Sequence, residues 1–263
     1  MAFVILCFPR TASTLLISAL GTHPLIRQGM EIFNPELEGD APYVPWRKAA
    51  LLDLYGPQSS YLNPMGYLDG QRFDLTRLSK RFFDDFDGTK IMYDQLDRNS
   101  GVWDQLTAMP GLRVIVMRRN FIDAAVSFKV ALDTNIWHVA AADAPHAPPP
   151  MTVEPGYFSW FYDHFCAGEA DITRRFNRSS IIELDYDSLI SNWQAEMTAV
   201  FNHLGLAPID CAMPFRKGLR VPAASLIANR SEIREHYARH PVLSRHVESA
   251  MRSLETCSAE RVP

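Results

Sequence analysis

Three short and nearly uninterrupted apolar runs stand out along the chain. They cover residues 3–8 (FVILCF), 112–117 (LRVIVM) and 180–184 (SIIEL). Such runs are typical of strands that are buried on both faces of a parallel sheet. Residues 25–30 and 88–94 carry weaker strand patterns. We therefore predict a sheet that is built mainly from buried strands.

Between these runs, apolar residues recur at steps of three and four, which predicts amphipathic helices. The longest covers residues 155–177, where Tyr157, Phe161 and Phe165 begin an apolar stripe. Strands that alternate with helices predict an α/β fold, a single domain with a central, mostly parallel sheet flanked by helices. The other predicted helices are 13–20, 73–86, 100–109 (opened by Ser100), 121–137, 192–204 (stopped by Gly205) and a short helix from a Ser231 cap to Tyr237.

Two proline-rich segments interrupt this alternation. Residues 34–72 mix prolines with tyrosines and a tryptophan, and residues 138–155 contain APHAPPP. Both are too long for simple connections, so we expect excursions over one end of the sheet. Ligands bind outside the carboxyl ends of the strands in open α/β sheets, where aromatic loops can build an acceptor pocket.

Composition excludes several classes of protein. The 263 residues are 47% hydrophobic, enough for a substantial core, and the net charge of −4 argues against general nucleic-acid binding. Four scattered cysteines without a C-x-x-C pair argue against a metal site or disulfides. The first apolar run ends at Phe8, which is too short for a signal peptide or a membrane span. We expect a cytoplasmic protein that uses no membrane.

The turn after the first predicted strand reads Pro-Arg-Thr-Ala-Ser-Thr, residues 9–14. Backbone N–H groups in such a turn, together with the following helix N-terminus, form a nest for anions. Arg10 adds a fixed positive charge, and Thr11, Ser13 and Thr14 add hydroxyl donors. The alternative is an ordinary capped helix start. The turn is not a Walker A loop, because the G-x-x-x-x-G-K-[ST] pattern is absent.

A second basic segment follows the strand at 112–117. Arg118 and Arg119 come directly after this strand, and Ser127 lies on the next predicted helix. An arginine at the carboxyl end of a parallel strand faces the ligand-binding edge of the sheet. A surface arginine pair beside a core-facing serine is the alternative, and it would be preferred if this segment stood alone.

Taken together, these segments resemble the sulfotransferases that use 3′-phosphoadenosine 5′-phosphosulfate (PAPS). That family has a P-[RK]-[ST]-G-[ST]-[ST] turn, and an arginine separated from a serine by seven residues, as Arg119 is from Ser127. HPLIRQGMEIFNP, FDGTKIMYDQL and LDYDSLISNWQAEMTAVFNHLGL resemble further segments of bacterial members near the trehalose and nodulation-factor sulfotransferases. The resemblance covers residues 3–34, 88–131 and 180–240.

The resemblance implies a P-loop NTPase-like sulfotransferase fold and a donor site for PAPS, with 3′-phosphoadenosine 5′-phosphate (PAP) as product and no metal. It implies that Arg119 and Ser127 grip the 3′-phosphate, and that Tyr186 lies near the adenine, although a core aromatic is nearly as good a reading of Tyr186. Arg216, Lys217 and Gly218 match a late loop that closes on the 3′-phosphate, with a solvated basic turn as the alternative. The residues that it assigns to the phosphosulfate are Arg10, Thr11, Ala12, Ser13 and Thr14.

Sulfuryl transfer needs a base, and the resemblance implies Glu31, which follows the weak strand at 25–30. An exposed glutamate that caps a loop is the alternative. His138 and His23 are rival bases, although His23 fits the end of the first helix equally well. Lys90 is a candidate to neutralise the sulfonate, with a solvated lysine as an equal alternative.

One position departs from the family pattern, because Ala12 replaces a glycine. If this residue has a positive φ, alanine costs about 1 kcal/mol there, and at a negative φ the change is harmless. The competing functions are a kinase-like phosphotransferase and a non-catalytic nucleotide-binding protein. The expected partner is a small-molecule acceptor with a hydroxyl or an amine. The oligomeric state is open, and a homodimer is among the options.

Overall fold

The computed structural model describes residues 1–34, 43–56, 67–68, 71–72, 75–96, 100–137, 139, 148–215, 219 and 221–259. The chain divides into two compact units. The first comprises Met1–Phe8, Ala12–Arg118 and Gly168–Ala212, and the second comprises Pro9–Thr11, Arg119–Ala167 and Met213–Pro263. The assignment of residues 1–263 to a single domain stays a prediction.

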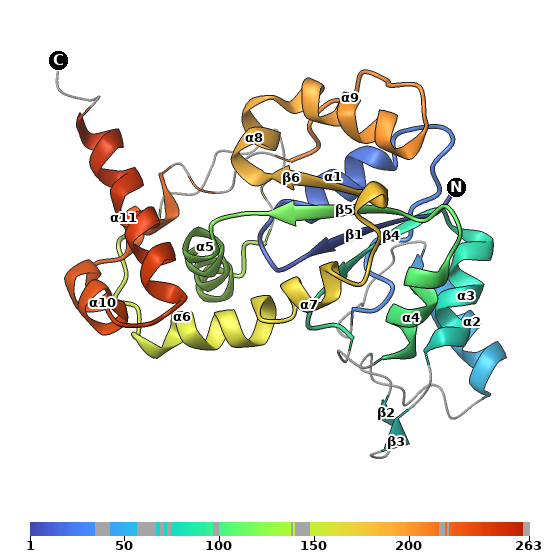
Figure 1. The fold of residues 1–263 in the computed structure, drawn as a ribbon, viewed down its shortest axis with the longest axis horizontal. Helices are drawn as coiled ribbons and strands as arrows, with labels where there is room; N and C mark the ends of the chain where they lie inside the picture. The colour runs from blue at the N-terminus through green and yellow to red at the C-terminus, as the bar shows by residue number, and fades with distance from the viewer. Residues whose placement is uncertain are drawn as a thin grey trace. The chain divides into compact units, whose positions relative to one another are not determined.

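The first unit holds a four-stranded parallel sheet (Figure 1). Its strands are β1 (Phe3–Cys7), β4 (Gly88–Met92), β5 (Arg113–Arg118) and β6 (Ile181–Asp185), in the order β4-β1-β5-β6. Every pairing in this sheet is parallel, which confirms the predicted α/β class. A separate antiparallel pair is formed by β2 (Tyr67–Leu68) and β3 (Gln71–Arg72).

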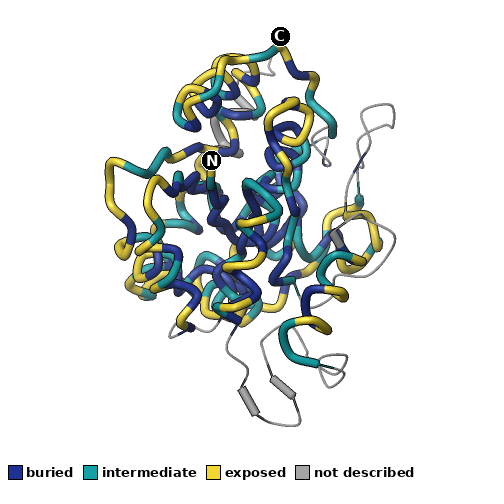
Figure 2. Tube along the Cα trace, turned by 90° about the vertical axis from the view of Figure 1, so that its right-hand side faces the viewer, coloured by how far each residue is buried: buried dark blue, intermediate teal, exposed yellow. Residues whose placement is uncertain are grey.

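The core follows the two central strands. All residues of β1 and the middle of β5 are buried. Figure 2 shows the buried parts of the trace in dark blue. Side chains on both faces of these strands are buried, so an apolar residue suits every position. The third predicted strand, at 180–184, is present as β6, but its predicted burial is wrong, because β6 lies at the sheet edge and Leu184 is its one fully buried residue.

Helices surround this sheet in two groups within the first unit. Helix α9 packs against β5 and β6 and next to α8, and α2, α3 and α4 pack in series, as Figure 1 shows. Gly205 ends α9 with a positive φ of 74°, as predicted. The helices are α1 (Ser13–Leu20), α2 (Tyr43–Tyr55), α3 (Thr76–Asp85), α4 (Gly101–Ala108), α7 (Glu169–Thr173), α8 (Tyr186–Ser191), α9 (Trp193–Leu204) and a 3₁₀ turn at Arg178–Ser180.

The second unit is helical in its described part. Helix α5 (Phe121–Thr134) begins at Asn120, whose side chain accepts a hydrogen bond from Ile122 N at 2.9 Å. It packs against α6 and α11 and against a 3₁₀ turn at Ala223–Leu226. The remaining helices are α6 (Gly156–Phe161), a π-helical turn at Tyr162–Cys166, α10 (Arg230–Tyr237) and α11 (Leu243–Ala259).

The predicted long helix at 155–177 is wrong in its middle. A π-helical turn follows α6, in which Ala167 N donates to Tyr162 O at 2.9 Å, and Gly168 then precedes α7. A π turn accommodates one extra residue, so the apolar stripe continues across it while the α-helix does not. The sequence pattern therefore could not reveal the break.

Three smaller predictions also need correction. Residues 25–30 form no strand, because their pairing with the sheet is the single bridge Gln28–Gly88. Ser231 does not cap α10, which starts one residue earlier, after Asn229. The excursion at 34–72 contains helix α2, in which Pro45 lies in the first turn, where a proline leaves no helical hydrogen bond broken.

Candidate active site

The turn at residues 9–14 has a strained backbone. Arg10 and Ala12 both have a φ of 68°, and Thr11 between them is not among the residues with positive φ. Alternating left- and right-handed residues are the arrangement by which successive N–H groups converge into an anion nest. Ala12 occupies the N-cap position of α1, in the left-handed conformation that a glycine would adopt freely. Ala12 therefore has a positive φ, the conformation in which alanine is less favourable than glycine.

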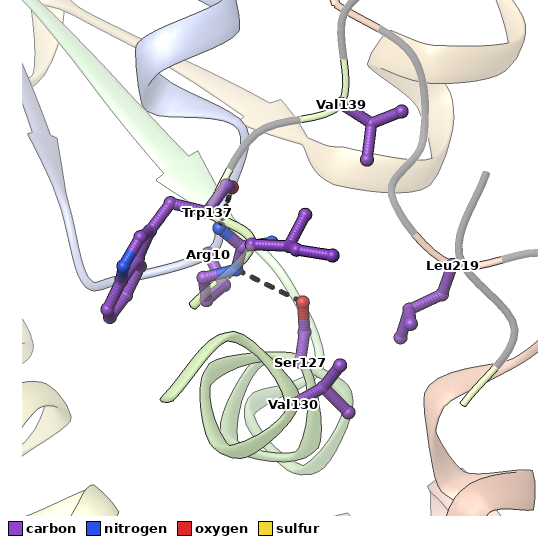
Figure 3. Close-up of a pocket in the computed structure, with 7 residues that line it drawn as sticks. Arg10, Ser127, Val130, Trp137, Val139 and Leu219 are labelled. Atoms are coloured by element: carbon purple, nitrogen blue, oxygen red, sulfur yellow. Dashed lines mark hydrogen bonds between the residues drawn. The ribbon is translucent and has the colours of Figure 1, made fainter. Parts of the chain in front are cut away.

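Three polar residues from distant segments meet within the second unit. Arg10 Nε donates to Ser127 Oγ at 3.1 Å (Figure 3). Arg119 Nη1 donates to the carbonyl oxygen of Arg10 at 2.5 Å. Arg10 Nη1 also donates to Trp137 O at 2.5 Å. The structure thus brings together the two motifs that the sequence could link only by resemblance.

A small pocket lies beside this cluster, as Figure 3 shows. Arg10 and Ser127 supply its polar wall, and Trp137 forms part of the apolar wall. Trp137 is held by an edge-to-face contact with Phe128, with ring centroids 5.7 Å apart. The remaining lining side chains are apolar, namely Val130, Ile136, Val139 and Leu219.

Glu31 lies in the first unit and is not the exposed glutamate of the alternative reading. Its carboxylate is ion-paired with Lys90, and the side chain is 12% exposed. Asn34 Nδ2 and Gln95 Nε2 both donate to Glu31 Oε2, at 2.6 and 3.2 Å. A carboxylate with three donors around it is held in one orientation.

Lys90 is buried in the middle of β4, so the reading as a solvated lysine is wrong. Its side chain is 2% exposed, and its ammonium group donates to Thr14 Oγ1 at 2.6 Å as well as pairing with Glu31. Thr14 belongs to the first turn of α1. Lys90 therefore contacts both Glu31 and Thr14, the last residue of the turn at 9–14.

The backbone before Glu31 is fixed along β4. Gly29 N donates to Gly88 O, and Lys90 N donates to Met30 O at 2.7 Å. A Cβ on Gly29 would lie 2.3 Å from the ring of Phe82, so no other residue fits there. Met30 has a φ of 47°, a backbone conformation that is unfavourable for any residue other than glycine. Such backbone conformations often occur at functional positions.

Cys7 ends β1 immediately before the turn. Burial raises the pKa of this thiol to about 11, and the nearby Lys90 ammonium group opposes the shift. Cys7 Sγ contacts Ile91 O at 3.8 Å. This cysteine is therefore a neutral packing group at neutral pH.

Other predicted site residues have separate environments. The ring of His23 accepts a hydrogen bond from Leu25 N at 3.2 Å and contacts Ala207 O at 3.3 Å, which favours its structural role. Tyr186 is buried at the start of α8, directly after β6. His138, Arg216, Lys217 and Gly218 lie outside the described residues.

The described residues contain neither a candidate metal centre nor a helix able to cross a membrane. Within that part of the chain, no three histidine, cysteine, aspartate or glutamate side chains are grouped so that they could hold a metal ion. None of the helices in the described part of the chain combines the length and the apolar character needed to cross a membrane.

Comparison with known proteins assigns a family. A sequence profile described as "Sulfotransferase family" matches residues 2–210. Nodulation protein H of Rhizobium meliloti (strain 1021) is 26% identical over 245 residues, covering 91% of this chain and 92% of that protein. Nodulation protein H of Rhizobium tropici is 27% identical over 243 residues, covering 91% and 90%.

Solved sulfotransferase structures are also similar to the chain. A sulfotransferase from Alicyclobacillus acidocaldarius aligns with a TM-score of 0.48 and 14% identity, covering 92% of this chain and 95% of its own. The sulfotransferase domain of the Synechococcus PCC 7002 olefin synthase aligns with a TM-score of 0.47 and 16% identity, covering 80% and 74%. Mouse SULT7A1, solved in complex with PAP, aligns with a TM-score of 0.48 and 10% identity, covering 95% and 88%.

Proposed function

The chain belongs to the sulfotransferase family and is a sulfotransferase, and we propose that it transfers the sulfuryl group of PAPS to a hydroxyl or amine of a small-molecule acceptor. In this in-line displacement, the acceptor atom forms a bond to sulfur as the bond from sulfur to the phosphate oxygen breaks. The acceptor proton passes to a base, and PAP leaves with the electron pair of the broken bond. No metal is required by this scheme.

The donor assignment rests on the cluster of Arg10, Arg119 and Ser127. A 3′-phosphate carries negative charge and several acceptor oxygens, which suit a guanidinium group and a hydroxyl. Arg119 and Ser127 are assigned to this phosphate. Their contacts to Arg10 within the second unit support the assignment, because one hydrogen-bonded cluster then joins both motifs. Tyr186 is assigned to the adenine, and Arg216, Lys217 and Gly218 to the closing loop.

The leaving group is stabilised by the turn at residues 9–14. The alternating backbone at Arg10 and Ala12 supports an anion nest for the 5′-phosphosulfate, to which Thr11, Ser13 and Thr14 add hydroxyl groups. Arg10 neutralises charge on the leaving phosphate oxygen. An arginine stays protonated throughout, so its part is electrostatic and it transfers no proton.

Glu31 is the proposed base. The observation that carries this role is the ion pair with Lys90, because it holds the carboxylate in place at a largely buried position, where a base can be aligned with the proton that it accepts. Lys90 offsets the charge of Glu31 and, through Thr14, adds positive charge next to the turn. His138 remains the first alternative base.

Substitution of Glu31 by glutamine tests this role. PAP release from PAPS is measured with water as the minimal acceptor, and PAP affinity is measured by calorimetry. We expect Glu31→Gln to bind PAP normally and to lose roughly 100-fold or more in rate. Glu183→Gln is the matched control, since Glu183 is exposed and pairs with Arg118. A near-normal rate in Glu31→Gln would move the base elsewhere.

A further inference from the structure

The two oxygens of the Glu31 carboxylate are held by different groups. Oε1 contacts the ammonium group of Lys90, while Oε2 accepts hydrogen bonds from the amides of Asn34 and Gln95. A carboxylate offers about two lone pairs on each oxygen. The two amides therefore occupy Oε2 fully, and the lone pair that stays open for a further proton is on Oε1.

Gln95 and Asn34 differ in their distance from Glu31 along the sequence. Asn34 is three residues from Glu31, and Asn34 N donates to Glu31 O, so this side chain moves with the base. Gln95 lies 64 residues away in sequence, just beyond the end of β4. Its amide is the contact on Oε2 that ties the carboxylate to the sheet.

The orientation of the Gln95 amide is fixed at both ends. Its side-chain oxygen accepts a hydrogen bond from Met92 N at 3.1 Å, and its nitrogen faces Glu31 Oε2. Reversal of the amide would set an N–H donor against Met92 N and an oxygen against a carboxylate. Gln95 as a whole residue is 3% exposed, so water does not compete readily for either contact.

We propose that Gln95 is a positioning residue for the sulfuryl transfer reaction. It holds Glu31 so that Oε1, the oxygen beside Lys90, accepts the proton of the acceptor hydroxyl or amine. Gln95 itself gives up no proton. This role rests on the proposed function of Glu31 as the base. The competing role is purely structural, in which Gln95 only satisfies Met92 N where β4 ends.

A double-mutant cycle separates these roles. The rate of PAP release from PAPS, with water as acceptor, is measured for the wild type, Gln95→Met, Glu31→Gln and the double variant. Methionine has a similar length but no hydrogen-bonding group. We expect Gln95→Met to lower kcat about tenfold or more with the KM for PAPS unchanged, because a displaced base loses its alignment. In the Glu31→Gln background the same change has less than about a twofold effect, since no base is left to position.

The control is Gln105→Met on α4. With its amide oriented to satisfy both groups, Gln105 also bridges two backbone positions, donating to Thr76 O and accepting from Lys80 N. Its loss likewise removes one donated and one accepted amide hydrogen bond, but neither involves Glu31. We expect a rate within about twofold of the wild type. PAP affinity, measured on every variant by calorimetry, reports whether the fold is intact.

The outcomes distinguish this proposal from the assignment of the base. An equal loss of rate in both backgrounds, or no loss in the wild-type background, overturns the positioning role of Gln95. An undiminished rate in Glu31→Gln overturns the base itself. If Gln95→Met fails to bind PAP, the cycle is repeated with Gln95→Ser, whose smaller side chain admits water to Met92 N, and the same criteria apply.

Discussion

The ammonium group of Lys90 and the carboxylate of Glu31 form an ion pair in which both side chains are largely removed from water. Lys90 is the middle residue of β4. Glu31 follows shortly after Gln28, which forms a β-bridge with Gly88 at the start of the same strand. A buried pair of this kind stabilises little by itself, but the loss of one partner leaves the other charge without compensation.

Removal of the Lys90 charge is therefore expected to destabilise the protein. Lys90→Met should lower the free energy of unfolding by about 3–5 kcal/mol, measured by urea denaturation. Lys129→Met is the control, because Lys129 pairs with Asp133 on an exposed helix face and its loss should cost about 1 kcal/mol or less. A similar small loss for Lys90→Met would contradict the buried pair.

The left-handed backbone at Ala12 gives a prediction of the opposite sign. Ala12→Gly should raise the free energy of unfolding by about 0.5–1 kcal/mol, because glycine adopts a φ of 68° without a steric penalty. Ala19→Gly, within helix α1, should lower it by about 1 kcal/mol. Thermal or chemical denaturation of the two variants checks the contrast, which disappears if the turn is not strained at Ala12.

The buried thiol of Cys7 makes stability depend on pH in the alkaline range. Its pKa is raised from 9.0 to about 11, so above pH 9 the unfolded chain loses this proton while the folded chain keeps it. The thiol contribution is therefore complete below pH 9 and is lost as the pH rises to 11, by about 2–3 kcal/mol.

Comparison with Cys7→Ala isolates this contribution, because other groups titrate alike in both proteins. The free energy of unfolding is measured for each protein at pH 8 and at pH 11. We expect the difference between wild type and Cys7→Ala to shrink at pH 11 by the stated amount. A difference that stays constant across this range would show that the Cys7 thiol is not kept neutral by burial.

The sequence predicted correctly those elements whose local apolar pattern matches the way in which they are buried in the fold. The central strands β1 and β5 read as apolar runs because their side chains are buried on both faces of the sheet. Helix α1 was predicted with its observed bounds, Ser13–Leu20, since its apolar face and its start after the turn are both local. Helix α2 was missed because Pro45 was taken as a sign of a loop, although a first-turn proline is compatible with a helix.

The candidate site was less accessible from the sequence. Lys90 gave no local sign of burial, because the partner that permits it, Glu31, lies far away along the chain. Gln95 and Asn34 were not predicted as contacts of Glu31. The signals available were their places in GTKIMYDQ and GMEIFN, segments already noted for their resemblance to sulfotransferases. Conversely, the pairing of Arg119 with Ser127 came from the family pattern, and the structure adds Arg10 as the residue that both contact.

Recognition of a 3′-phosphate is the central claim, and calorimetry with PAP and with adenosine 5′-phosphate tests it most directly, since the two ligands differ only in that group. We predict that the wild type binds PAP roughly 10–100-fold more tightly, and that Arg119→Ala loses this preference. Arg118→Ala, whose arginine pairs instead with Glu169 and Glu183, should keep it. Equal affinity of the wild type for the two ligands, or an unchanged preference in Arg119→Ala, would contradict the account.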